Sequence, residues 1–234
     1  PGVTVVGTAA NGRIALNKIP LLRPDLLTLD LEMPEMDGLS LLGELRHSDW
    51  EVGVIVLSSA NKEGANATMA ALNLGALDFV PKPVGGNAEE NIKVLQRELV
   101  PKMEAFARKR HIRDILHRRA PAPASGPPAE QSVDVFEQLR RSVGMPPAGK
   151  SSRVDAVGIG ISTGGPNALN RMLPRLPADL PVPILIVQHM PPVFTRSLAE
   201  DLDKRCSLRV SEASDGQAVL PGHVLIAPGG RQMK

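Results

Sequence analysis

Short apolar runs alternate with stretches of helical pattern in two separate parts of this chain, and this alternation limits the fold more than any other feature. In the first part, the apolar runs cover residues 3–6, 26–29, 54–57 and 79–80, and the helical stretches cover residues 12–19, 39–46 and 66–74. A β-α-β rhythm of this kind predicts a doubly wound parallel sheet. Strands that are buried on both faces explain why each run is continuously apolar.

A second alternation begins at Val154. It predicts strands at residues 155–161, 184–187, 208–210 and 224–226, and helices at residues 167–173 and 195–204. We find no internal repeat that relates the two parts. The sequence therefore predicts two α/β domains, each built on a doubly wound parallel sheet.

A basic segment and a proline-rich segment join the two parts. Residues 89–119 have a helical pattern that we expect Pro101 to interrupt, and residues 93–119 hold nine Lys or Arg against three acidic residues. Such a basic helix is either a DNA-binding element or a solvated face that leads into a linker. Residues 120–150 carry six prolines, which is a linker composition, and residues 134–141 within them could form a helical turn or two. We therefore expect domains at residues 1–110 and 153–234, with a linker at residues 111–152.

Composition excludes several classes of protein. Of the 234 residues, 42% are hydrophobic and 22% are charged, which is typical of a globular protein and rules out disorder over the whole chain. No run reaches the ~18 apolar residues of a membrane span, so we expect no membrane insertion. The single cysteine, Cys206, excludes a disulfide framework and favours a reducing cytoplasm. A net charge of +2, four Phe, one Trp and no Tyr argue against a nucleic-acid partner.

Three polar residues directly follow apolar runs of the first part: Asp30, Ser58 and Lys82. The carboxyl ends of parallel strands form the ligand-binding edge of an open sheet, so we expect these side chains to converge. Asp30 would then accept a phosphoryl group, Ser58 would hydrogen-bond a phosphoryl oxygen, and Lys82 would neutralise charge. Taken singly, such residues are more often a helix N-cap, a loop hydroxyl and a surface charge.

Together with their neighbours, these residues resemble the receiver domain of two-component response regulators. The resemblance covers residues 1 to about 110 and rests on the string Asp30-Leu-Glu-Met-Pro34-Glu-Met-Asp37-Gly38, followed by Ser58 and by Lys82-Pro83. It implies that a histidine kinase phosphorylates Asp30, which also binds Mg²⁺. Ser58 and Phe79 then match switch positions, and Lys82 matches the phosphate partner.

The resemblance also shows a departure at the start of the chain. The receiver family begins with a strand that ends in two acidic residues, followed by a helix, and nothing before Val3 corresponds to them. We therefore expect the other Mg²⁺ carboxylates to be missing. Acetyl phosphate is then expected to phosphorylate Asp30 poorly.

The second part contains the string Gly158-Ile-Gly160-Ile-Ser162-Thr163-Gly164-Gly165. A dinucleotide fingerprint would need glycine in place of Thr163 and an acidic residue about twenty positions later, and neither is present. Residues 160–164 instead satisfy G-x-S-x-G between a strand and a helix, where a serine sits on a tight turn with its hydroxyl exposed. Ser162 is therefore a candidate nucleophile.

His189 directly follows the next predicted strand, in the string Ile184-Leu-Ile-Val-Gln188-His189. A lone histidine is more often a buried or surface residue, but at the end of an adjacent parallel strand it is a credible general base for Ser162. Backbone amides after Ser162 could stabilise an oxyanion. The remaining histidines lack such a position and receive no role: His47, His111, His117 and His223.

The complete arrangement resembles the chemotaxis response regulators that are protein-glutamate methylesterases, the CheB family. Beyond the receiver-like part and the Ser162 motif, it rests on the strings Gln188-His189-Met190-Pro191 and Leu220-Pro-Gly-His-Val-Leu-Ile-Ala-Pro-Gly-Gly230. The resemblance implies hydrolysis of glutamate methyl esters and deamidation of glutamines on chemoreceptors. Ser162 would be the nucleophile and His189 the base, with Thr163 beside them and no cofactor for this reaction.

The family's third triad member is an aspartate well beyond the Ala-Pro-Gly-Gly string, and no aspartate follows Asp215. We therefore expect a chain truncated at both ends and weakly active or inactive, because without the carboxylate the imidazole tautomer is not fixed. Extension to include that aspartate should restore esterase activity.

The tethered receiver implies regulation. We expect the unphosphorylated receiver to cover the Ser162 cleft and phosphorylation of Asp30 to weaken this packing, so that deletion of residues up to about 150 raises basal activity. One alternative is a phosphorylation-controlled DNA-binding regulator, which leaves Ser162 and His189 unexplained. Another is a catalytically silent module that binds receptors.

Overall fold

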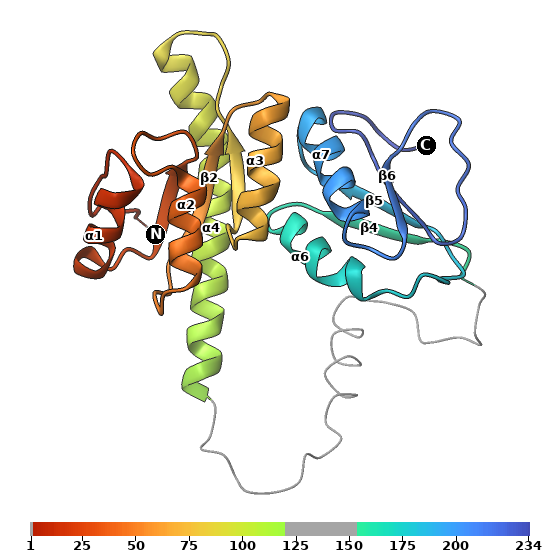
Figure 1. Cartoon of the computed structure of the whole chain (residues 1–234), viewed down its shortest axis with the longest axis horizontal. Helices are drawn as coiled ribbons and strands as arrows, with labels where there is room; N and C mark the ends of the chain where they lie inside the picture. Colours follow the sequence, from red (N-terminus) through yellow and green to blue (C-terminus); the bar gives the residue numbers. More distant parts are fainter. Residues whose placement is uncertain (1, 120–153) are drawn as a thin grey trace, which may run out of the picture.

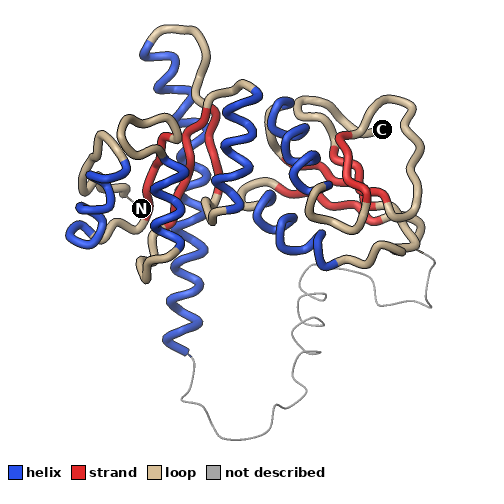
Figure 2. The backbone as a smooth tube through the Cα atoms, viewed as in Figure 1, coloured by secondary structure: helices blue, strands red, loops and turns tan. Residues whose placement is uncertain are grey.

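The computed structural model describes residues 2–119 and 154–234. Two parallel sheets lie side by side, each with its own helices (Figures 1 and 2). The prediction of two α/β domains is confirmed. Within the described ranges, no helix has the combination of length and apolarity that crossing a bilayer requires.

The first sheet has three parallel strands in the order β1-β2-β3. Three helices lie on one of its faces, and the long helix α4 lies on the other (Figure 1). The strands are β1 (Leu26–Asp30), β2 (Gly53–Ser58) and β3 (Asp78–Pro81), and the helices are α1 (Gly12–Leu22), α2 (Gly38–Arg46), α3 (Lys62–Asn73) and α4 (Ala88–Arg119).

Polar caps fix the starts of α1, α2 and α3. Asn11, Asp37 and Asn61 have extended backbone, and each side chain accepts a hydrogen bond from the backbone N–H three residues further on. Such a cap stabilises a helix by about 1 kcal/mol. Because α2 and α3 follow β1 and β2, their caps hold the carboxyl edge of the sheet, where Asp30 and Ser58 lie.

Residues 3–6, which we expected to form a strand, do not form one. Val3 and Val5 are 68% and 78% exposed. Among the described residues no strand pairs with this segment, and β1 pairs with β2 alone. A strand needs a hydrogen-bonded neighbour, which a local apolar pattern cannot report.

Helix α4 is continuous across Pro101, so the expected interruption there is wrong. Pro101 and Arg97, four residues before it, are both exposed. The Arg97 carbonyl, which loses its helical partner at Pro101, can therefore bond to water. The helix runs past residue 110 to Arg119, and the helical turn expected at residues 134–141 lies outside the described residues.

The second sheet has four parallel strands in the order β4-β5-β7-β6. Helices α6 and α7 lie on the face that is turned toward the first domain (Figure 1). The elements are β4 (Val157–Ile161), α6 (Gly165–Met172), a short 3₁₀ helix (Leu173–Arg175), β5 (Ile184–Gln188), α7 (Pro192–Asp203), β6 (Arg209–Glu212) and β7 (His223–Ile226).

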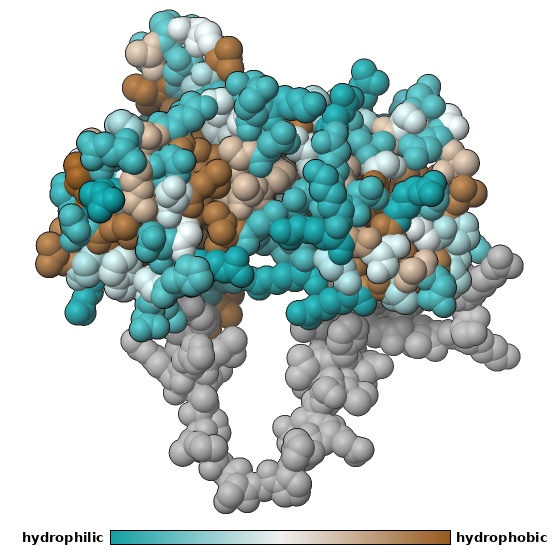
Figure 3. All heavy atoms as spheres, viewed as in Figure 1, coloured by the Kyte–Doolittle hydropathy of each residue, from teal (hydrophilic) through white to brown (hydrophobic). Residues whose placement is uncertain are grey.

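The two domains contact one another through α3 and β3 of the first and α6 and α7 of the second. At the centre the Phe79 and Phe194 rings pack with centroids 4.5 Å apart, and both residues are buried. Hydrogen bonds surround this pair, among them Asn73 to Asp201 and Ser197 to Asn66. The contact thus combines one aromatic pair with a polar rim, and the face drawn in Figure 3 is largely polar where the domains meet.

Candidate functional site

Ser162 and His189 lie at the carboxyl edge of the second sheet. They follow Ile161 and Gln188, which are paired in the parallel register of β4 and β5. The His189 N–H extends this ladder by donating to the Ile161 carbonyl at 3.1 Å. The strand ends therefore bring these two residues next to each other, as the sequence predicts.

The turn that carries Ser162 depends on two glycines. Gly164 has a φ of 74°, a left-handed conformation that favours glycine, and it is the N-cap of α6. A side chain at Gly165 would collide with the Gln188 amide oxygen. The Gly165 N–H donates to the Ser162 carbonyl at 2.8 Å and closes the turn.

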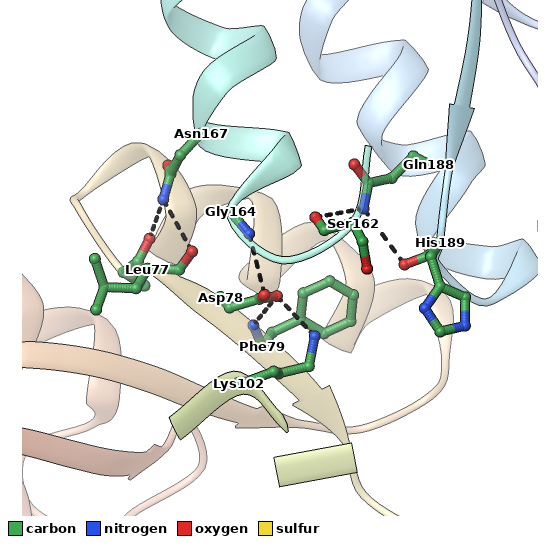
Figure 4. A network of polar contacts seen from close by, with 10 residues as sticks. Leu77, Asp78, Phe79, Lys102, Ser162, Gly164, Asn167, Gln188 and His189 are labelled. Atoms are coloured by element: carbon green, nitrogen blue, oxygen red, sulfur yellow. Dashed lines mark hydrogen bonds and ion pairs between the residues drawn. The ribbon is translucent and has the colours of Figure 1, made fainter. Parts of the chain in front are cut away.

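Gln188 joins the two strand ends. Its amide nitrogen donates to the Ser162 carbonyl at 3.1 Å and to the His189 carbonyl at 3.3 Å (Figure 4). Its buried amide oxygen has no hydrogen-bond partner within residues 2–119 and 154–234. In the sequence, Gln188 belongs to the Gln188-His189-Met190-Pro191 string, which indicates no role for its side chain. Its position at the last residue of a buried strand is the signal that could have revealed one.

A cavity of about 590 Å³ opens beside Ser162 and His189. Gln188 lines it from the end of β5, Met190 from the segment that follows β5, and residues 227–231 from the loop after β7. Within the described residues, neither the Ser162 hydroxyl nor the His189 ring makes a hydrogen bond, and both residues are exposed together with Thr163. Polar groups without partners in an open cavity are available to a ligand.

The loop that lines the far side of the cavity is fixed by Thr195. The buried Thr195 hydroxyl accepts from the Gly229 N–H at 3.0 Å and lies 2.6 Å from a Glu212 carboxylate oxygen. A side chain at Gly229 would collide with the backbone of residues 190–192. This loop is therefore held tightly against the segment that follows His189.

The receiver-like site lies at the carboxyl edge of the first sheet. The Lys82 ammonium is 2.8 Å from the Asp30 carboxylate and 3.6 Å from that of Glu32. Glu32 also accepts a hydrogen bond from the Ser59 hydroxyl at 3.1 Å. The predicted approach of Lys82 to Asp30 is thus observed, and Glu32 is a further carboxylate at this edge.

Ser58 and Phe79 are not directed at Asp30. The buried Ser58 hydroxyl donates to the Gly64 carbonyl at 2.8 Å, and the Phe79 ring packs on Phe194 of the second domain. A hydroxyl that has found a buried acceptor is not free for another ligand. Ser58 must leave Gly64 before it can reach a phosphoryl oxygen on Asp30.

The expectation that the first domain covers the Ser162 cleft is not met. Ser162 and His189 are exposed although the domains are in contact, and no residue of the first domain lines the cavity. The first domain instead contacts the turn after Ser162 and the helix α6: Asp78 accepts from the Gly164 N–H, and the carbonyls of residues 76–77 accept from the Asn167 side chain (Figure 4). These contacts join distant parts of the chain, so sequence patterns gave no sign of them.

The two sheet edges define a response regulator in which a receiver domain is joined to a domain with a serine-histidine cavity. Comparison with protein families agrees: residues 1–95 match the response regulator receiver domain, and residues 157–234 match CheB methylesterase. The chain belongs to the CheB family. The DNA-binding alternative has no support in these matches.

Curated relatives match along the whole chain. A protein-glutamate methylesterase/protein-glutamine glutaminase of Desulfotalea psychrophila is 46% identical over 100% of this chain and 62% of its own length. The protein of the same name from Symbiobacterium thermophilum is 45% identical over 100% of this chain and 62% of its own length. The chain thus spans less than two thirds of the length of these relatives.

Solved structures match each domain separately. The CheB methylesterase catalytic domain of Thermotoga maritima is 54% identical over 33% of this chain and 41% of that chain, with a TM-score of 0.32. The response regulator domain of Thermotoga maritima CheB is 36% identical over 44% of this chain and 75% of that chain, with a TM-score of 0.39.

Proposed function

We propose that the protein hydrolyses methyl esters of glutamate side chains on chemoreceptors, and deamidates glutamines there, under the control of its receiver domain. The observation that carries this proposal is the placement of Ser162 and His189 after register-paired residues, on the wall of one open cavity. The names of the relatives support the substrate class.

In this reaction the Ser162 hydroxyl attacks the ester carbonyl, and His189 takes the hydroxyl proton as general base. Collapse of the tetrahedral intermediate expels methanol, which receives that proton, or ammonia when the substrate is glutamine. Water, deprotonated by His189, then hydrolyses the acyl-serine and releases a glutamate side chain. The exposed position of Ser162 and His189 in the cavity is suited to a substrate carried by another protein.

Backbone amides are the natural donors to the oxyanion of the intermediate. The Thr163 N–H directly follows the nucleophile, in the turn before α6, where the helix dipole favours negative charge. The next two amides are already bonded, that of Gly164 to Asp78 and that of Gly165 to the Ser162 carbonyl. Removal of one such donor costs on the order of 10² to 10³ in turnover in other hydrolases. Thr163 is therefore the proposed backbone donor of this turn.

Covalent capture of Ser162 tests the proposal directly. We expect a fluorophosphonate probe to label Ser162 in the native full-length protein, with no labelling in the Ser162→Ala variant. Labelling should slow at least tenfold in His189→Ala, because general-base catalysis contributes roughly 10²- to 10⁴-fold. Peptide mass spectrometry identifies the labelled residue. Capture at another residue, or unchanged capture without His189, contradicts the assignment.

The receiver edge is proposed as the phosphorylation site, with Asp30 as acceptor and Lys82 as the cation beside the phosphoryl group. The ion pair of Asp30 with Lys82 supports these roles, because Lys82 already lies where a phosphoryl group on Asp30 would carry its charge. The histidine kinase of a chemotaxis system is the proposed donor, and the chemoreceptors are the proposed substrates, in the cytoplasm.

Mg²⁺ is the cofactor that a receiver domain implies for phosphorylation. Mg²⁺ prefers oxygen ligands and is often held by one or two carboxylates together with phosphate oxygens. The Asp30 carboxylate fits this preference, with Glu32 close by, although no group of three metal-ligating side chains occurs among the described residues. When bound, the ion would neutralise the charge of the phosphoryl group. The esterase reaction is proposed to need no cofactor.

A further inference from the structure

The side chain of Gln188 contacts both residues that carry the proposed chemistry. Its amide nitrogen donates to the backbone carbonyls of Ser162 at 3.1 Å and of His189 at 3.3 Å (Figure 4). Within residues 2–119 and 154–234, no other side chain forms a hydrogen bond with either residue. The position of Gln188 is set by β5, whose register pairs it with Ile161, the residue before Ser162.

The backbone ladder between the two strands ends where the site begins. The His189 N–H makes the last of its bonds, to the Ile161 carbonyl at 3.1 Å. Beyond this bond, one segment turns into α6 and the other runs on to α7. The Gln188 amide provides the next link between these segments, so the relative placement of Ser162 and His189 depends on it.

The contacts of Gln188 fix the orientation of its amide. The NH₂ group faces two carbonyl oxygens, which accept hydrogen bonds and would repel an amide oxygen. The amide oxygen lies against Gly165, where an added side chain would collide with it. With its nitrogen occupied and its oxygen packed against backbone, this side chain, which is 6% exposed, is suited to holding the chain and not to binding a substrate.

The buried oxygen shows that stability alone does not account for this glutamine. It has no partner among the described residues, and a buried acceptor without a partner lowers the stability of a fold. An apolar side chain of similar length would avoid that cost. The Ser162 carbonyl would then keep its bond from the Gly165 N–H at 2.8 Å, and His189 is exposed to solvent.

On this basis we propose that Gln188 is a positioning residue, which holds the backbones of Ser162 and His189 at the separation that proton transfer between their side chains requires. General-base catalysis needs the two side chains within about 2.6–3.2 Å of each other. Neither side chain is bonded to another described residue, so their backbones set this distance. The inference rests on the proposed function and adds a residue to its machinery.

The test compares Gln188→Met with wild type in the native full-length protein, by the rate at which a fluorophosphonate captures Ser162. We expect the maximal rate to fall about 10- to 100-fold and the half-saturating probe concentration to stay within about twofold, because a misplacement of about 1 Å can cost about 10²-fold. The pH profile of labelling should keep its midpoint, because Gln188 contacts the His189 carbonyl and not the ring. An unchanged rate or a shifted midpoint overturns the inference.

Urea unfolding of the same variant separates positioning from a structural role. We expect the midpoint of Gln188→Met to equal or exceed that of wild type, because the variant removes the unpartnered buried oxygen. Slower labelling of an equally stable protein supports the inference. A midpoint that falls together with the labelling rate assigns Gln188 to stability and contradicts it.

Gln188→Glu is a second variant, which keeps the length of the side chain but places a carboxylate where a donor is needed. Because a carboxylate only accepts hydrogen bonds, it faces the carbonyls of Ser162 and His189 without bonding to them. We expect it to lose at least as much of the labelling rate as Gln188→Met. Labelling of Gln188→Glu as fast as that of wild type contradicts the inference.

Gln217→Met is the matched control. Gln217 lies in the same domain and its side chain also bonds to two neighbours, Ser211 and Ser214, but it does not line the cavity. We expect its labelling rate to match that of wild type, and equal losses in both methionine variants count against the inference. Capture of Ser162 in wild type without hydrolysis of the receptor ester overturns the proposed substrate and leaves the comparison at Gln188 intact.

Discussion

The carboxyl edges of the two sheets are built alike but differ in how their polar groups are partnered. At the receiver edge Asp30 is paired with Lys82, and the Ser58 hydroxyl is bound to Gly64. At the edge of the second sheet, the Ser162 hydroxyl and the His189 ring have no partner among the described residues and face a cavity.

This difference separates two tasks that parallel sheets perform. Partners that are already in place must be exchanged when a phosphoryl group arrives, so the receiver edge is suited to changing the state of the molecule. The Ser162 hydroxyl and the His189 ring have no partners to exchange, so the edge of the second sheet is suited to binding a substrate directly. The partners of polar residues at strand ends therefore discriminate between a switch and a reaction site.

Replacing the Ser162 hydroxyl, at the carboxyl edge of the second sheet, should have the largest effect on esterase activity. In Ser162→Ala of the native full-length protein we expect hydrolysis of the receptor ester to fall by at least about 10³-fold, as in other serine hydrolases that lose the nucleophile. Thr163→Val, which removes the neighbouring hydroxyl, should cost less than about tenfold in kcat. Methanol release from labelled receptor measures both. A Ser162→Ala variant that retains a tenth of the activity would break the assignment of this edge.

Replacing Asp30, the proposed phosphoryl acceptor at the receiver edge, should abolish regulation by phosphorylation and leave ester hydrolysis intact. In Asp30→Asn of the native full-length protein we expect no stimulation by acetyl phosphate with Mg²⁺, while activity without phosphorylation stays within about twofold of wild type. Lys82→Met should be phosphorylated on Asp30 yet show weaker stimulation, because the cation that would follow the phosphoryl group is gone. Stimulation that persists in Asp30→Asn would place the acceptor elsewhere.

Adding a methyl group at Gly165 tests how rigidly the turn that carries Ser162 is held against Gln188. Gly165→Ala drives a side chain into the Gln188 amide oxygen, and we expect a loss of about 1–3 kcal/mol in the free energy of unfolding. Gly158→Ala is the matched control, because nothing lies within 4 Å of a side chain there. Urea unfolding measures both. Equal stability of the two variants would show that Gln188 adapts without cost.

The smallest effect concerns the helix cap beside the receiver edge. The Ser40 N–H, which donates to the Asp37 carboxylate at 2.7 Å, lowers the pKa of Asp37 below its ordinary value of 3.8. A lowered pKa stabilises the folded state above pH 3.8, and this contribution is lost as the pH falls through the folded-state pKa.

Asp37→Ala should therefore lower the free energy of unfolding by about 1 kcal/mol at pH 7. Asp37→Asn keeps the capping oxygen without the titrating charge, so its deficit relative to wild type should shrink as the pH falls below 4. Thermal unfolding between pH 3 and pH 7 separates the two. A deficit of Asp37→Asn that grows toward low pH would contradict the cause assigned to this shift.

The features that sequence predicted well are those that a local pattern determines. The strand ends at Asp30, Ser162 and His189 follow from apolar runs that stop at a polar residue, and parallel pairing then brings Ser162 beside His189. The missing strand at residues 3–6 and the continuity of α4 at Pro101 depend on neighbours and solvent, which a pattern does not contain. The contact of Asp78 with Gly164 spans 86 positions of sequence, and no local rule connects such residues.

The rim of the domain contact has a consequence for how easily the two halves part. Its hydrogen bonds, such as those of Asn73 with Asp201 and of Ser197 with Asn66, surround a hollow of about 340 Å³ between α3 and α7. Water can replace such bonds at a net cost of about 1 kcal/mol each, whereas separation also exposes the buried Phe79 and Phe194 rings to water.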